Sequence, residues 1–126
     1  MSAGFDSLRF AAPMPGLETA EGFSLRGIPG AGGLFALEAV EPKVRMFVAD
    51  ASVYVPDYAP AIPGSALEAV GVSSPAEATT LVVVNPAAEK TTVNLMAPIV
   101  LNPATGTCIQ VILADGKYPL RAELAA

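Results

Sequence analysis

The sequence predicts a mostly β fold, a small antiparallel β-barrel or meander with one or two short helices. Apolar residues make up 52% of the 126 residues and charged residues 15%, so the chain can bury a core. Twelve prolines and eleven glycines punctuate the chain. They lie between apolar runs, as expected of short strands joined by turns. The length fits a single domain over residues 1–126.

The first half contains apolar runs that we interpret as strands at Ser7–Phe10, Leu34–Val40 and Val44–Asp50. The run Val44–Asp50 has almost no polar break, which predicts a central strand buried on both faces. Ser52–Val55 is expected to extend or follow that strand. Residues 1–21 are expected to be less ordered than the rest.

One short helix is predicted after the strands of the first half. Ser65 is the expected N-cap, Leu67 and Val70 give a one-sided apolar pair, and Gly71 is the expected stop. Pro75 is placed to begin a further helical turn.

The second half is more regular, because several of its runs are β-branched or alternate apolar with polar residues. The expected strands are Thr79–Val84, Thr91–Leu95, Ala97–Leu101 and Cys108–Leu113. We expect Pro98 to interrupt the β structure, so that Thr91–Leu95 and Ala97–Leu101 are separate strands. Asn102–Gly106 has the composition of a hairpin turn. Sequential strands joined by such short turns pair antiparallel.

The residue types needed for common catalytic and metal sites are missing. The chain has no histidine and one cysteine, Cys108, which excludes histidine-based catalysis and zinc binding. Gly30–Gly33 lacks the lysine and helix signal of a phosphate loop and is interpreted as a turn. Cys108 is expected to be a small buried hydrophobe. We therefore expect no enzyme activity, no cofactor and no metal.

The charge of the chain argues against nucleic acid as a partner. The net charge is −5 and the seven basic residues are scattered along the sequence. Nucleic-acid surfaces need clustered cations, so direct nucleic-acid binding is not expected. No apolar run has the length of a membrane span, and no signal peptide is recognised. These features predict a cytoplasmic protein that works by binding other proteins. We expect it to be a monomer when alone.

Two stretches carry a resemblance to a known family. The first is Pro56–Tyr58 followed by Leu67–Glu77; the second is Thr92–Gly106 followed by Gln110–Leu113 and Tyr118–Arg121. Both resemble the FliW family of flagellar assembly factors, over most of residues 22–124. The chain departs from the family pattern at Ala31, where an aromatic residue is usual, and in a shorter segment Phe35–Ala51.

The resemblance implies a function in flagellar gene regulation. FliW-like proteins bind CsrA, a small basic RNA-binding regulator, and stop it from repressing translation of flagellin messenger RNA. They also bind flagellin. Free flagellin then sequesters the FliW-like protein and releases CsrA, so that flagellin limits its own synthesis.

We expect partner contact around the second stretch and the Asp57-Tyr58 turn. The candidate partner-binding residues are Asp57, Tyr58, Asn94, Met96, Pro98, Ile99, Val100, Leu101 and Asn102. Structural roles compete with this interpretation: Ile99 and Val100 fit a core, Asn94 fits a staple for loop backbone, and Tyr58 fits a core anchor.

Two other functions stay open. A small-ligand-binding β-barrel would contain a closed apolar cavity with a few polar groups. A carboxylate hydrolase would hold two facing acids in a cleft.

Overall fold

A computed structural model describes residues 5–12, 22–30, 32–41, 43–56, 58–85, 90–113, 118–119 and 122–123, with backbone only for residues 5–7. The strands are β1 (Phe5–Phe10), β2 (Phe23–Gly27), β3 (Leu34–Ala39), β4 (Val44–Asp50), β5 (Thr79–Asn85), β6 (Thr92–Asn102), β7 (Thr107–Gln110) and β8 (Ala122–Glu123). The helices are α1 (Ala51–Tyr54), α2 (Gly64–Val70) and the 3₁₀ turn η1 (Pro75–Glu77).

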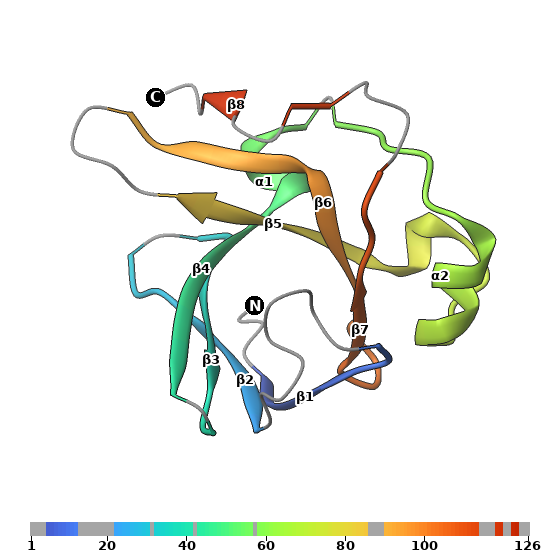
Figure 1. Cartoon of the computed structure of the whole chain (residues 1–126), viewed down its shortest axis with the longest axis horizontal. Helices are drawn as coiled ribbons and strands as arrows, with labels where there is room; N and C mark the ends of the chain where they lie inside the picture. The colour runs from blue at the N-terminus through green and yellow to red at the C-terminus, as the bar shows by residue number, and fades with distance from the viewer. Residues whose placement is uncertain are drawn as a thin grey trace.

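The strands form a closed barrel, which confirms the predicted fold class. Each strand from β1 to β6 pairs antiparallel with the next, and β1 then pairs with β7 to close the ring (Figure 1). The closing pair is parallel, with Arg9 opposite Thr107. A meander that closes after an odd number of strands brings first and last strands side by side in the same direction. Short β8 pairs with the start of β6.

Strand β6 differs from its prediction as two strands separated at Pro98. It is one strand of 11 residues that bends sharply (Figure 1). Its pairing with β5 shifts there: Leu81 is opposite Ile99, but Val83 is opposite Asn94. The extra residues of β6 form a bulge, which bends a strand and tolerates a proline without ending the strand.

The segment Ser52–Val55 was expected to extend or follow the preceding strand, but Ser52–Tyr54 is helical in α1 and Val55 is the C-cap of that helix. Asp50 caps this helix, since its Oδ1 accepts from the Ser52 backbone N–H at 2.9 Å and the Ser52 hydroxyl at 2.7 Å. An N-cap carboxylate satisfies an N–H that the helix leaves free. This local bond outweighs the β preference of Val53 and Val55.

Helix α2 matches its prediction except at its start. Pro63 occupies the N-cap, so Ser65 lies inside the helix. Leu67 and Val70 are buried, and Gly71 ends the helix in the left-handed region with φ 83°. A glycine is favoured there because it has no Cβ to clash. Pro75 begins η1 as expected.

The barrel interior is a single packed cluster to which all seven strands contribute. Its buried members are Leu8, Phe23, Leu25, Phe35, Leu37, Ala39, Val48, Leu81, Ile99, Leu101 and Cys108. Burial raises the pKa of the Cys108 thiol to about 12, which fits the predicted inert hydrophobe. An interior filled by side chains favours a structural core over the closed ligand cavity of the small-ligand alternative.

The strand that is buried on both faces is β6, not β4 as the sequence predicted. Helix α2 covers the outside of β6 and β7, where Ala66, Leu67 and Val70 pack with Val100. Ile99 and Leu101 face the barrel core. In β4, complete burial is limited to Val48 and Ala49, so the expectation for Val44–Asp50 holds only for the end of that strand.

Candidate protein-binding surfaces

The bend of β6, which we call the β6 corner (residues 94–99), is held by side chains that bond its backbone. Asn94 Oδ1 accepts from the N–H groups of Met96 at 2.9 Å and Ala97 at 3.2 Å. These N–H groups lie where β6 shifts register against β5. Asn94 therefore supplies the acceptor for two bulge donors.

The carbonyl groups of the β6 corner are also bonded. The Tyr58 hydroxyl donates to the Leu95 carbonyl, and Gln110 Nε2 donates to the Ala97 carbonyl at 3.2 Å. The Met96 and Pro98 carbonyls accept from the backbone N–H groups of Leu113 and Val111, at 2.7 and 2.8 Å. Residues from three separate segments thus determine this bend.

The side chain of Asn102, at the end of β6, also bonds backbone groups. Asn102 is 7% exposed. Its Nδ2 donates to the Val70 carbonyl at 2.8 Å, and its Oδ1 accepts from the Ala104 N–H at 2.9 Å. The first bond satisfies a carbonyl in the last turn of α2, and the second fixes the β6–β7 turn. Asn102 therefore ties the covering helix to the barrel.

A hollow of about 220 Å³ lies beside Tyr58, against α1 and the start of β5. Its lining residues are Asp50, Ala51, Ser52, Pro56, Tyr58, Ala78, Thr79 and Thr80. Tyr58 also packs edge-on against Tyr118, with ring centroids 4.8 Å apart. This tyrosine is half-buried, so it both anchors the β6 corner and borders an accessible surface.

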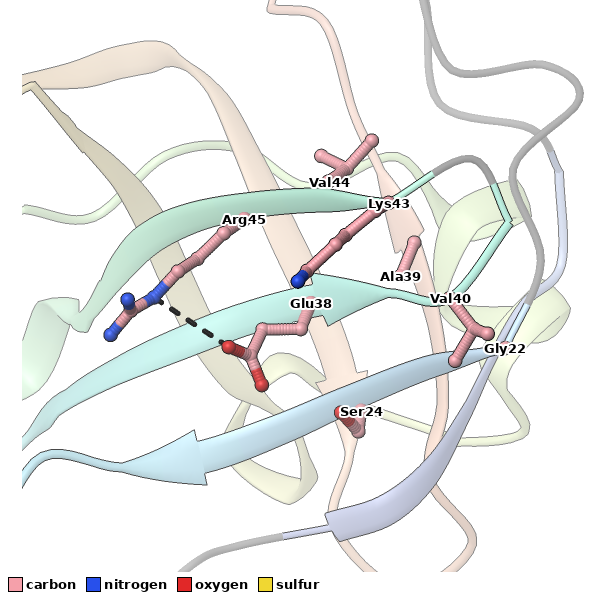
Figure 2. Close-up of a pocket in the computed structure, with 8 residues that line it drawn as sticks. All are labelled: Gly22, Ser24, Glu38, Ala39, Val40, Lys43, Val44 and Arg45. Carbon is pink, nitrogen blue, oxygen red and sulfur yellow. Dashed lines mark ion pairs between the residues drawn. The ribbon is translucent and has the colours of Figure 1, made fainter.

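A larger hollow, which we call the hairpin groove, lies across β2, β3 and β4 and has a volume of about 410 Å³. It is lined by Gly22, Ser24, Glu38, Ala39, Val40, Lys43, Val44 and Arg45. Figure 2 shows the Lys43 side chain extending across the hairpin beside Glu38 and Arg45. Val40, at the end of β3, is 72% exposed.

The charges at the hairpin groove are unequally paired. Glu38 Oε2 lies 3.1 Å from Arg26 Nη2 and 3.6 Å from Arg45 Nε, the second pair being drawn in Figure 2. Glu38 thus has two cationic neighbours. Lys43 forms no ion pair with any residue that the structure describes.

Comparison with known proteins places the chain in a family. The model of the FliW protein family matches residues 4–124. This chain belongs to the FliW family. It is 34% identical to the flagellar assembly factor FliW of Symbiobacterium thermophilum, covering 91% of this chain and 86% of that protein. It is 31% identical to the flagellar assembly factor FliW of Moorella thermoacetica, covering 94% and 78%.

A solved FliW structure has the same fold. The crystal structure of the flagellar assembly factor FliW superposes with a TM-score of 0.83 and 26% identity, covering 94% of this chain and 84% of that one. The family match begins well before residue 22, where the sequence resemblance was placed. The added part includes β1, the strand that closes the barrel.

Several of the residues predicted to bind partners lie inside this FliW-family fold. Pro98, Ile99, Val100 and Leu101 are buried, each at 2% exposure or less, so their side chains belong to the core in this conformation. Asn94 and Asn102 bond backbone groups, as the competing staple interpretation of Asn94 predicts. Tyr58 and Met96 are half-buried, and Asp57 lies outside the described residues.

Sequence reasoning missed the hairpin groove because its cations are scattered along the chain. Arg26 is on β2, while Lys43 and Arg45 lie at the start of β4. The register places Glu38 directly opposite both Ser24 and Arg45. The signal was the turn around residues 40–43: a four-residue connection pairs Ala39 with Val44, and hence Glu38 with Arg45.

The described residues offer no metal centre. They contain no group of three or more Cys, Asp or Glu side chains placed to hold an ion. Within those same ranges, every buried side-chain nitrogen or oxygen has a hydrogen-bond partner. No described helix combines the length and apolar character that a membrane span requires.

Proposed function

We propose that this chain is a cytoplasmic flagellar assembly factor that acts by binding proteins, with a CsrA-like translational regulator and flagellin as its two partners. Binding to the regulator relieves repression of flagellin messenger RNA, and flagellin competes for the chain. The observation that carries the proposal is the FliW family match over residues 4–124. The curated relatives bear the name flagellar assembly factor.

Charge and chemistry support binding over catalysis. The chain carries a net charge of −5, which favours encounter with a basic regulator. Its described carboxylates are largely engaged: Asp50 caps α1, Glu38 pairs with two arginines, and Glu77 accepts from the Ser73 N–H. That arrangement gives little support to a hydrolase with two facing acids.

The proposed switch rests on linked equilibria. If the two partners exclude each other, each lowers the apparent affinity of the other by the same factor. Rising free flagellin then transfers this chain from the regulator to flagellin. The regulator returns to its messenger RNA, and flagellin synthesis falls.

The test uses purified chain, regulator and flagellin encoded in the same genome. Each partner alone should bind the immobilised chain, and added flagellin should displace the regulator. In a gel-shift assay, the chain should release flagellin messenger RNA from the regulator. If neither protein binds, the proposal is wrong; if both bind at once with unchanged affinity, the partner switch is wrong.

Ionic strength separates two modes of regulator binding. Attraction between acidic chain and basic regulator should weaken as salt rises. A salt-independent affinity would instead indicate an apolar interface. Because Ile99–Leu101 is buried, such an interface would require exposed apolar residues elsewhere, such as Val53 or Ile112.

A further inference from the structure

We propose that the hairpin groove is a docking site for an acidic, apolar segment of a partner protein, one that places a carboxylate on Lys43 and an apolar side chain on Val40. This goes beyond the proposed function, which names partners without assigning either to a surface. The proposal rests on the charge of the groove, on its exposed valine and on its polar wall.

The first argument is charge. Two of the seven cations of an acidic chain, Lys43 and Arg45, line the groove, and a third, Arg26, lies beside it and pairs with Glu38. Glu38 already faces two of them, and exposed Glu41 lies on the adjoining turn without lining the groove. Lys43 keeps its charge available. A segment bearing carboxylates is therefore attracted here, while a basic segment is repelled.

The second argument is the exposed valine. Val40 is 72% exposed although it borders a hollow of the surface. Gly22 approaches it closely: the φ of Gly22 is +74°, and an added Cβ there would lie 3.1 Å from the Cβ and Cγ2 atoms of Val40. The backbone of Gly22 and the side chain of Val40 together form one wall of the groove. Covering this exposed valine with an apolar partner side chain removes apolar surface from water, which favours binding.

The third argument is hydrogen bonding. The Ser24 side chain is half-buried in the groove and forms no hydrogen bond with the residues that the structure describes. A hydroxyl can donate and accept, so it can bond the backbone of an incoming segment. A partner segment in which acidic and apolar residues alternate can therefore place a carboxylate on Lys43, an apolar side chain on Val40 and a backbone group on the Ser24 hydroxyl.

The first experiment needs no natural partner. The acetylated, amidated tetrapeptide Glu-Leu-Glu-Leu is titrated into the isotope-labelled chain and followed by amide NMR shifts. We expect shifts centred on Ser24, Val40 and Lys43, with a dissociation constant on the order of millimolar. The peptide Lys-Leu-Lys-Leu should shift these residues far less. Shifts scattered over the surface, or equal for both peptides, would overturn the proposal.

A matched pair of double variants tests the residues. Lys43→Glu with Val40→Ser should weaken acidic-peptide binding by at least about tenfold. Lys90→Glu with Val53→Ser makes the same changes outside the groove, at an exposed lysine that pairs with Glu123 and at an exposed valine. That control should stay within about twofold of wild type, in line with the small worth of exposed contacts. Equal losses in both would count against the groove, and thermal melts check that both fold.

The second experiment assigns the natural partner. A water-soluble carbodiimide joins an amine to a carboxylate in direct contact, and mass spectrometry identifies the pair. Coupling of Lys43 to an Asp or Glu of flagellin or of the regulator supports the proposal and names the partner. Coupling only through Lys90 would overturn it. If neither protein binds the chain at all, the proposed function fails, while the peptide titration still decides the groove.

Discussion

The two amides of β6 and the charges of the hairpin groove use polar side chains in opposite ways. Asn94 and Asn102 lie in a stretch that is mostly buried, and both bond backbone within the chain. Lys43 and Arg45 are exposed, and Lys43 has no ionic partner among the described residues. The long stretch that carries the family resemblance therefore mainly stabilises the fold. Lys43, whose charge stays available to a partner, lies outside that stretch.

The difference has an energetic reason. A buried polar group that loses its partner costs about 1–3 kcal/mol, because no water replaces the lost bond. An exposed ion pair contributes about 0–1 kcal/mol, because water and salt screen it. Substitutions in β6 should therefore act on folding, and substitutions in the hairpin groove should act on binding.

The largest effect is expected from Asn102→Asp. The substitution keeps the acceptor for the Ala104 N–H, but it replaces the amide that donates to Val70 by an oxygen. A buried carboxylate then faces a carbonyl oxygen, and we expect a loss of about 3 kcal/mol in the free energy of unfolding. Urea denaturation measures it. A loss below about 1 kcal/mol would show that α2 does not depend on this bond.

The next effect is expected from Asn94→Ala, which removes the acceptor shared by the Met96 and Ala97 N–H groups. We expect a loss of about 2 kcal/mol by the same denaturation assay. Asn94→Asp is the control, because it preserves the acceptor oxygen and should stay within about 0.5 kcal/mol of wild type. The same amide-to-acid change is thus severe at Asn102 and mild at Asn94. Equal effects at both positions would refute the different bonding roles.

The same contrast explains what sequence reasoning can reach. Most strands were predicted within a few residues, because β-branched runs and turn residues act locally. The single course of β6 through Pro98 was missed, since its bend is bonded not only by Asn94 within the strand but also by Tyr58 and Gln110 from other segments. Helix α1 was missed because Val53 and Val55 favour strands, although Asp50 gave a capping signal.

The surface was harder to predict than the core. Ile99 and Leu101 face the barrel core, but burial of Val100 between them follows from helix α2 covering the outer face of β6, a contact between segments that no local pattern reveals. Likewise, Arg26 and Arg45 come together only through the register of β2, β3 and β4. Periodicity predicts which residues alternate. It does not say which face a neighbouring element will cover.

A smaller effect is expected from Tyr58→Phe. The change removes the hydroxyl that donates to the Leu95 carbonyl but keeps the ring that packs edge-on against Tyr118. We expect a loss of about 1 kcal/mol in the free energy of unfolding. Titration of flagellin and regulator onto the variant then shows whether the hollow beside Tyr58 takes part in binding. An unchanged stability would mean that water replaces the hydroxyl at the β6 corner.

The smallest effect on stability is expected from substitutions in the hairpin groove. Their effect on the free energy of unfolding tests whether β6 serves folding and the groove serves binding. Lys43→Gln removes a charge without an ion-pair partner among the described residues, so unfolding should shift by less than about 0.5 kcal/mol. Glu38→Gln weakens two exposed ion pairs and should cost about 0.5 kcal/mol. If Lys43→Gln destabilises the fold as much as Asn94→Ala, Lys43 is part of the scaffold. Lost peptide binding in its variants would then report misfolding. If it leaves stability unchanged, any lost binding must come from the groove itself.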